Sequence, residues 1–225
     1  MTITCRRISR VAPLSTFSSK VAIAIPAYNE GPHLAELIAR CRATRPTVIV
    51  VVDDASTDDT PAILAALARE PGAPLMVLRN APNLGKQGSV RRALRALRGV
   101  DVDAVALIDG DLQHEPSELP GLVELLRDHD AIIGARDQSE MPSHRRFSNW
   151  LVNRTFAAFA GIDFADVQSG LRIYRKAISD ALALALPERG GFGIEHESLA
   201  LLAQLAAERT APLRLAAATI TCRYG

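Results

Sequence analysis

Short apolar runs alternate with helical patterns through the first 135 residues of the chain. The runs lie at residues 21–25, 47–52, 75–78, 104–108 and 131–134. Apolar runs of this length predict buried strands, and the segments between them carry apolar residues at helical spacing. This alternation predicts an α/β fold in which helices flank a mostly parallel central sheet, with right-handed crossovers between its strands.

The pattern changes after residue 136. Residues 137–143 are polar and predict a loop, and residues 145–160 predict a helix rich in aromatic side chains. A turn over residues 166–172, a short strand, helices over 176–186 and 194–208, and a last strand over 213–221 complete the chain. No linker-like composition interrupts residues 20–225, so we expect a single domain there.

Residues 1–19 form a basic leader. Arg6, Arg7 and Arg10 carry its charge, and neither an acidic residue nor an apolar core accompanies them. This composition predicts a disordered leader or a misplaced start codon, with a transit peptide as the alternative.

Composition excludes several classes of protein. The formal net charge of +1 does not predict nucleic-acid binding, and the sequence has no run of 18 apolar residues to span a membrane. The three cysteines, Cys5, Cys41 and Cys222, are odd in number and widely spaced. Neither a disulfide framework nor a cysteine metal motif follows, so we expect a reducing cytoplasm.

Residues 109–114 read Asp-Gly-Asp-Leu-Gln-His and follow the fourth predicted strand. Asp109 and Asp111 therefore stand at the carboxyl end of a buried strand, where open α/β sheets bind their ligands. With Gln113 they offer hard oxygen ligands, which suit Mg²⁺ or Mn²⁺ held partly by a phosphate. Gly110 is expected to let a ligand approach the backbone. The alternative is a solvated acidic turn.

Two further polar loops follow predicted strands, at residues 26–30 and 53–59. In a parallel sheet they meet the 109–114 loop at one end of the sheet. Such loops can hold a nucleotide, with Tyr28 stacked on the base and Asp54 accepting from a base N–H or a ribose hydroxyl. The chain has neither the Gly-x-Gly-x-x-Gly fingerprint after its first predicted strand nor a P-loop.

Other acidic residues have structural interpretations. Asp53 is expected to satisfy turn N–H groups, and Asp58 and Asp59 are expected to cap the helix that follows them. Glu195 and Glu197 stand at the start of a predicted helix, where the helix dipole accounts for them.

Six motifs in order resemble a known family. They are Ile25-Pro-Ala-Tyr-Asn-Glu30, Val51-Val-Asp-Asp-Ala-Ser-Thr-Asp58, Asn83-Leu-Gly-Lys86, Asp109-Gly-Asp-Leu-Gln-His114, Gly134-Ala-Arg136 and Ser169-Gly-Leu-Arg172. They resemble family 2 glycosyltransferases over residues 20–225, and within that family the dolichyl- or polyprenyl-phosphate mannosyl- and glucosyltransferases. The resemblance implies a GT-A fold with a single Rossmann-like domain, a nucleotide-sugar donor, a divalent metal and an inverting transfer.

The resemblance also implies roles for individual residues. The residues implied to bind the donor are Pro26, Tyr28, Glu30, Asp54, Lys86, Asp109, Gly110 and Arg136. The implied metal ligands are Asp111 and Gln113, and the implied catalytic residues are Asp109, Asp111 and Arg223. The residues implied to bind the phosphate of a lipid acceptor are Arg145, Arg146 and Ser148.

Three features depart from the family pattern. Ala55 stands where glycine is usual, and we expect it to keep a negative φ. Leu171 replaces a phenylalanine, a change expected to keep the core apolar. The sequence ends at Gly225, whereas relatives continue through another loop and often through transmembrane helices, so the domain is expected to be short at its C-terminus.

Three functional hypotheses follow. The leading one is a metal-dependent enzyme of the bacterial cell envelope that moves a hexose from a donor of the GDP-mannose or UDP-glucose type to dolichyl or undecaprenyl phosphate. A phosphate monoester is largely dianionic at neutral pH and can attack without a general base. A saccharide or other hydroxyl acceptor would need a base, for which Asp111 and His114 are the candidates. The third hypothesis is an inactive nucleotide-sugar-binding remnant.

The predicted 145–160 helix bears on localisation. Phe147 and Trp150 share a face of it with other apolar residues, and arginines can flank that face. This pattern predicts a cytoplasmic protein that associates peripherally with the inner face of the membrane. The alternative is a helix of the protein core.

Overall fold

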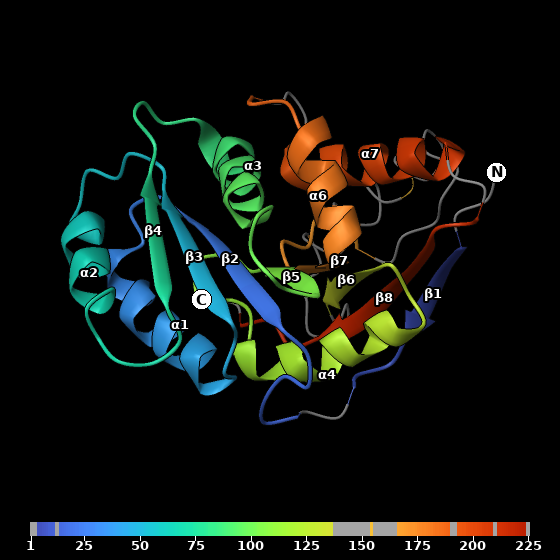
Figure 1. The fold of residues 1–225 in the computed structure, drawn as a ribbon, viewed down its shortest axis with the longest axis horizontal. Coiled ribbons are helices and arrows are strands. Elements are labelled where there is room, and N and C mark those ends of the chain that lie inside the picture. Colours follow the sequence, from blue (N-terminus) through green and yellow to red (C-terminus); the bar gives the residue numbers. More distant parts are fainter. Residues whose placement is uncertain are drawn as a thin grey trace.

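Within its described residues, the computed structural model contains an eight-stranded sheet between two layers of helices (Figure 1). The structure describes residues 4–11, 14–136, 154, 166–189, 193–208 and 211–223. The strands are β1 (Thr4–Ile8), β2 (Val21–Ala27), β3 (Val48–Asp53), β4 (Leu75–Arg79), β5 (Ala104–Leu107), β6 (Ala131–Arg136), β7 (Arg172–Arg175) and β8 (Arg214–Ile220). The helices are α1 (Gly31–Ala43), α2 (Thr60–Leu67), α3 (Gly85–Leu97), α4 (Leu119–Glu124), α6 (Lys176–Ala185) and α7 (Ile194–Glu208), with short 3-10 turns η1 (Pro116–Glu118) and η2 (Leu125–Arg127) on either side of α4.

One strand of the sheet runs against all the others. The strand order is β1-β8-β6-β7-β5-β2-β3-β4, and β7 pairs antiparallel with both β5 and β6, whereas every other pair is parallel. The carboxyl ends of the parallel strands therefore meet at one end of the sheet. The start of β7 lies at this same end, because its first residue, Arg172, pairs with Leu107 at the end of β5.

Each face of the sheet buries its own apolar cluster. In β2, Ala22 and Ala24 face α3, α6 and α7, while Val21, Ile23 and Ile25 face α1, α2 and α4 (Figure 1). All five side chains are fully buried. A strand covered on both faces is apolar throughout, which explains why this sequence shows a continuous apolar run. The two helical layers make the sheet a rigid scaffold for the loops at its ends.

The elements predicted from the sequence are largely confirmed, but the prediction of a disordered leader is wrong in part. All five apolar runs form strands, β2 to β6. Residues Thr4–Ile8, expected to be disordered, form β1 and pair in parallel with β8. Cys5 packs against the apolar cluster on one face of the sheet and Ile8 against the cluster on the other. This strand therefore buries apolar surface, although its sequence has no long apolar run from which a strand could be predicted.

The loop predicted over residues 137–143 and the aromatic helix predicted over 145–160 lie outside the described residues, apart from Arg154. Both stay predictions. Among the helices that the structure does describe, none is long and apolar enough to cross a membrane.

Ala55 adopts a left-handed conformation, with a φ of 62°. The expectation that it keeps a negative φ is therefore wrong. The turn is fixed by Asp53, as predicted, because Asp53 Oδ1 accepts a hydrogen bond from the N–H of Ser56 at 2.9 Å. For an alanine this conformation costs roughly 1–2 kcal/mol, which the contacts of the turn offset. Leu171, by contrast, is fully buried in the core, as expected.

Candidate functional site

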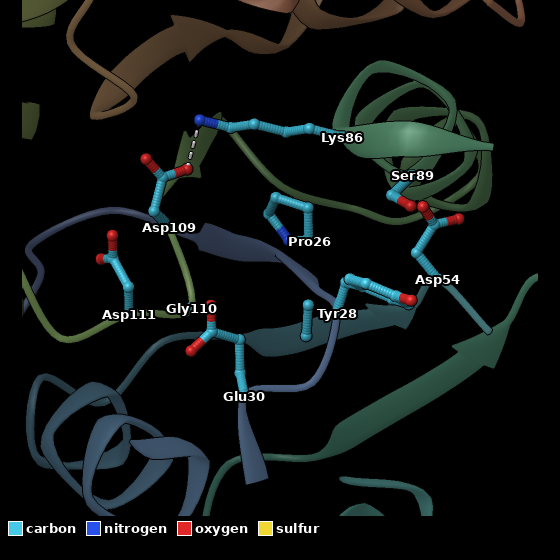
Figure 2. Close-up of a pocket in the computed structure, with 10 residues that line it drawn as sticks. Pro26, Tyr28, Glu30, Asp54, Lys86, Ser89, Asp109, Gly110 and Asp111 are labelled. Carbon is cyan, nitrogen blue, oxygen red and sulfur yellow. Dashed lines mark ion pairs between the residues drawn. The ribbon is translucent and has the colours of Figure 1, made fainter. Parts of the chain in front are cut away.

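A cavity of about 240 Å³ opens at the carboxyl end of the sheet, between the loops that follow β2, β3 and β5 (Figure 2). It is lined by Pro26, Ala27, Tyr28, Glu30, Asp54, Lys86, Ser89, Asp109, Gly110 and Asp111. Seven of the eight residues that the resemblance assigns to the donor are among them. These residues come together because the strands are parallel, so that loops distant in sequence leave the sheet at the same end.

Tyr28 forms part of the cavity wall and is 49% exposed, so its ring is not committed to the core. Hydrogen bonds tie its loop to the loop after β3. The N–H of Asn29 donates to Ser56 Oγ at 3.0 Å, and the N–H of Thr57 donates to Asn29 Oδ1 at 2.9 Å. A half-exposed ring on a fixed loop can stack on a flat base.

Asp54 is held by an amide side chain that sequence reasoning missed. Asp54 Oδ1 accepts hydrogen bonds from Asn80 Nδ2 at 2.7 Å and from the N–H of Leu84 at 2.9 Å. Asn80 is fully buried and also donates to Ser89 Oγ at 3.1 Å. These bonds fix the carboxylate at the cavity wall. The only sequence signal for Asn80 was a polar residue directly after a strand, β4.

Asp58 joins the starts of two helices. It accepts hydrogen bonds from the N–H of Thr60 in α2 at 3.0 Å and from the N–H of Gly31 in α1 at 3.3 Å. Hydrogen bonding, first of all to the Thr60 side chain, lowers the pKa of Asp58. The capping prediction is thus confirmed for Asp58. It is wrong for Asp59, which stands at the N-cap position but makes no side-chain cap bond in this described turn.

Asp109 and Asp111 lie on either side of Gly110, just beyond the end of β5 (Figure 2). A β-carbon at Gly110 would lie 3.2 Å from the Pro26 carbonyl oxygen and 3.2 Å from Glu30 Cγ. The glycine therefore lets the β5 loop approach the β2 loop closely. This close packing within the chain favours glycine here, in addition to the ligand contact predicted for it.

The oxygen ligands at the end of β5 fit a divalent cation that a diphosphate helps to hold. Asp111 Oδ1 accepts a hydrogen bond from the N–H of Gln113 at 3.1 Å, which fixes the turn that carries both side chains. In the parts of the chain that the structure describes, no group of three or more His, Cys, Asp and Glu side chains could hold a metal by itself. Mg²⁺ is commonly bound through one or two carboxylates, with substrate phosphates and waters completing its shell. The oxygen ligands at the end of β5 match that pattern.

Lys86 bridges two carboxylates. Its Nζ lies 2.7 Å from Asp109 Oδ1, the ion pair dashed in Figure 2, and 2.6 Å from Glu195 Oε1. Burial lowers the pKa of Lys86, but the two carboxylates together outweigh burial, so the pKa is raised and the amine stays charged. Sequence reasoning explained Glu195 by the helix dipole and missed this contact, because its partner is 109 residues away in the chain.

Arg136, at the end of β6, is held by a buried carboxylate. Its Nε lies 2.6 Å from Asp166 Oδ2 and its Nη2 lies 3.0 Å from Asp166 Oδ1, a bidentate pair. Asp166 is 1% exposed, and it too was missed in the sequence. Such a pair fixes the plane of the guanidinium. The role of Arg136 in binding the donor stays a prediction.

Arg223 lies beside the turn that carries the candidate metal ligands. Its N–H donates to the Gln113 carbonyl at 2.9 Å, and its Nη2 pairs with Glu115 Oε2 at 3.0 Å. The catalytic role predicted for Arg223 likewise stays a prediction. The residues predicted for the acceptor phosphate, Arg145, Arg146 and Ser148, lie outside the described residues.

His114 is buried behind the carboxylates. Burial lowers its pKa more than the nearby Asp109 and Asp111 raise it, so the imidazole is neutral at neutral pH. Its backbone forms an isolated bridge with Cys222, near the end of the chain. The burial of His114 leaves little access for an acceptor hydroxyl, which argues against its predicted role as a base.

Proteins of one family are similar to this chain in sequence. The family model described as Glycosyl transferase family 2 matches residues 22–183. Undecaprenyl-phosphate 4-deoxy-4-formamido-L-arabinose transferase of Sodalis glossinidius is 33% identical over 179 residues, which cover 77% of this chain and 54% of that protein. The protein of the same name from Pseudomonas paraeruginosa is 33% identical over 202 residues, which cover 87% of this chain and 57% of that protein. The chain thus spans little more than half the length of these relatives.

Solved structures share the fold at lower identity. A mannosyltransferase from Pyrobaculum calidifontis, in complex with GDP-Man and Mn²⁺, matches with a TM-score of 0.64 and 20% identity over 94% of this chain and 58% of its own. Glucosyl-3-phosphoglycerate synthase from Mycobacterium tuberculosis, in complex with Mn²⁺, UDP-glucose and phosphoglyceric acid, matches with a TM-score of 0.66 and 18% identity over 100% of this chain and 81% of its own.

Proposed function

Because this chain belongs to glycosyl transferase family 2, we propose that it transfers a hexose from a nucleotide sugar to polyprenyl phosphate. The mostly parallel sheet with its two helical layers is the GT-A fold. The donor is of the GDP-mannose or UDP-glucose type, the cofactor is Mg²⁺ or Mn²⁺, and the transfer inverts the anomeric carbon.

The composition of the cavity carries this proposal. One wall offers the half-exposed ring of Tyr28, and another offers the fixed carboxylate of Asp54. The end of β5 offers Asp109 and Asp111, with the charged amine of Lys86 beside them. A base or ribose suits the first two groups, and a diphosphate with its cation suits the other three.

The residues have distinct tasks in the transfer. Tyr28 and Asp54 bind the nucleoside, so that the sugar lies toward Asp109. Asp111 and Gln113 would hold a divalent cation, which when bound would supply positive charge to neutralise and orient the leaving nucleoside diphosphate. Lys86 adds a positive charge beside Asp109, where negative charge develops on the leaving group. Because Lys86 is already held by two carboxylates, it is in place before the donor arrives.

Polyprenyl phosphate is the acceptor that the relatives support, since their names describe transfer involving undecaprenyl phosphate. The phosphate is itself the nucleophile, and its second pKa near 6 leaves it largely dianionic at neutral pH. The site then needs no general base. Arg145 and Arg146, at the start of the predicted 145–160 helix, would guide this anion by charge-assisted hydrogen bonds.

A hydroxyl acceptor is the second candidate, and Glu195 favours it. Such an acceptor needs a base within hydrogen-bond reach. The Glu195 carboxylate lies 2.6 Å from Lys86 Nζ and is therefore near the cavity, unlike the buried His114. One solved relative is named as forming glucosyl-3-phosphoglycerate, and it shares the fold. Glu195 is thus a more accessible base candidate than His114, and Asp111 is expected to be engaged as a metal ligand.

Two measurements test the proposal. A thermal-shift screen of GDP and UDP with and without Mn²⁺ is expected to show a metal-dependent rise in the unfolding temperature, because a ligand that binds only the folded state stabilises it. Transfer from GDP-mannose or UDP-glucose is then measured with polyprenyl phosphate and, separately, with phosphoglyceric acid. Lipid-linked product supports the leading proposal, and product with the hydroxyl acceptor alone supports the second.

The inactive alternative has its own signature. A chain that binds nucleoside diphosphate with Mn²⁺ but neither transfers nor hydrolyses any of these donors would be a binding protein. A chain that binds no nucleoside diphosphate under any of these conditions would contradict all three hypotheses.

A further inference from the structure

Lys86 belongs to a closed circuit of contacts. It runs from Asp109 through Lys86 to Glu195, along α7 to Ser198, and back through Arg172 and Gly170 to Asp109. The members come from the β5 loop, α3, α7 and the start of β7. Sequence reasoning singled out the Ser169–Arg172 motif but gave it no task.

Arg172 is the most deeply buried charged member of this circuit, at 1% exposed. Its Nε donates to the Ser169 carbonyl at 3.1 Å, its Nη2 to the Val167 carbonyl at 2.8 Å, and its Nη1 to Ser198 Oγ at 2.8 Å. Burying a charge is costly unless such bonds replace its hydration. Because a guanidinium presents its donors in a rigid fork, these bonds fix the turn before β7 and α7 relative to each other.

Ser198 connects Arg172 to the part of α7 that carries Glu195. Its Oγ accepts from Arg172 and donates to the Ile194 carbonyl at 2.7 Å, one turn earlier in the helix. Glu195 directly follows Ile194 and reaches Lys86 from that turn. The orientation of the first turn of α7 therefore depends on the buried guanidinium.

The turn that Arg172 holds also supports Asp109. Gly170 lies in this turn, and a β-carbon there would lie 2.6 Å from Asp109 Cγ. The Asp109 carboxylate therefore packs directly against the backbone of the turn. A shift of the turn would displace this carboxylate, and with it the partner of Lys86.

We propose that Arg172 is a positioning residue, which sets the separation of Asp109 and Glu195 and thereby the placement of Lys86 between them. This inference rests on the proposed function, in which Lys86 and Asp109 face the donor. It gives the buried arginine a task beyond stabilising the fold.

The reactivity of Lys86 tests this role without any substrate. The chain has three lysines, Lys20, Lys86 and Lys176, so native-state acetylation of each can be followed by mass spectrometry. In Arg172→Met we expect Lys86 to react about threefold faster, the scale of losing a partly exposed ion pair, while Lys20 and Lys176 keep their rates. Arg172→Lys keeps the charge but loses the fork, and the same acceleration is expected.

Arg175→Met is the matched control. Arg175 lies in the same strand, at the opposite end of β7, and its guanidinium also donates to backbone carbonyls, among them His129 at 2.8 Å and Arg127 at 3.1 Å. This variant is expected to lower stability without changing the relative rate of Lys86.

Ser198→Ala keeps the test decisive if Arg172→Met does not fold, because it breaks only the connection to α7. Selective acceleration of Lys86 in either variant, absent in Arg175→Met, supports the positioning role. An unchanged Lys86 rate, or equal acceleration of all three lysines, overturns it.

The proposed function and the positioning role of Arg172 can be refuted independently. The labelling needs neither donor nor acceptor, so a chain that binds no nucleotide could still show the selective response of Lys86. Where transfer is measurable, Ser198→Ala is expected to raise the KM for the donor more than it lowers kcat, whereas a purely structural loss would reduce the active fraction and leave KM unchanged.

Discussion

The carboxylate of Asp109 lies directly against the α-carbon of Gly170. A β-carbon at this position would lie 2.8 Å from Asp109 Oδ1, closer than real β-carbons approach other heavy atoms. The two residues belong to different halves of the chain and meet because β7 runs antiparallel beside β5. A glycine in the second half of the sequence is therefore part of the geometry of a carboxylate in the first half.

Gly170→Ala is expected to displace Asp109 and reduce transfer on the order of a hundredfold, the scale of misplacing a catalytic group by about 1 Å. Steady-state kinetics and the unfolding temperature are measured together. Gly99→Ala is the control, because a β-carbon there meets nothing within 4 Å. Wild-type kinetics in Gly170→Ala would mean that Asp109 does not need its observed position.

Asp111→Asn is expected to abolish the Mn²⁺-dependent part of nucleoside diphosphate binding while the protein stays folded. The amide keeps the shape of the side chain but loses the negative charge that attracts a hard cation. Thermal shift by GDP and UDP, with and without Mn²⁺, measures the effect. If the metal dependence is the same as in the wild type, Asp111 is not a metal ligand.

Asp54 is expected to contribute mainly to nucleoside diphosphate binding, and Asp58 mainly to the stability of the fold. Asp54→Asn keeps an oxygen for Asn80 and Leu84 but removes the charge, so it should weaken nucleoside diphosphate binding. Asp58→Ala removes the acceptor shared by the starts of α1 and α2, so it should lower the unfolding temperature. Titration calorimetry and thermal unfolding of both variants would refute this division if each change had the same effect on affinity.

Cys41 should make the protein less stable in alkali. Burial, with a smaller effect of Glu115, raises the pKa of the Cys41 thiol from 9.0 to about 12. The unfolded chain therefore loses this proton first, and the free energy of unfolding falls as pH rises from 9 toward about 12. At pH 10 this one group costs on the order of 1 kcal/mol.

Denaturant unfolding with reductant, at pH 8 and pH 10, measures this loss. Cys41→Ala is the control, since it lacks the titrating thiol, and it should lose less stability between the two pH values than the wild type. Equal losses would show that Cys41 does not titrate differently in the folded protein.

The predicted 145–160 helix leads to a membrane experiment. We expect the chain to float with anionic vesicles, high salt to weaken this association, and Trp150→Glu to reduce it without affecting nucleotide binding. Neutral vesicles are the control. If the wild type does not float, or if Trp150→Glu unfolds the protein, the helix belongs to the core and the membrane interpretation is wrong.

Local sequence patterns were sufficient to predict strands β2 to β6 and the loops that form the cavity. Each buried strand of the parallel sheet is a continuous apolar run, and the polar residues that follow it lie at a predictable end of the sheet. Tyr28, Asp54 and Asp109 could therefore be brought together from sequence alone. The sequence also favoured a structural role for Asp53, because short acidic side chains commonly accept from turn N–H groups.

Contacts between distant segments could not be predicted in this way. Nothing in residues 172–175 indicates that β7 runs backward, so the meeting of Gly170 with Asp109 was not foreseen. Glu195, Asp166 and Asn80 were missed for a similar reason, since each acts through a partner from another element. The positive φ of Ala55 was missed because alanine gives no sign of a left-handed turn.

The backward course of β7 also bears on how proteins of this kind can diversify. The ten described lining residues of the cavity all precede residue 112, whereas Gly170 and Glu195 approach Lys86 and Asp109 from the second half of the chain. Inherited changes in that later half can reshape one side of the site while the groups around Tyr28 and Asp54 persist. The proposed nucleotide site could in this way be kept while the acceptor side of the site varies.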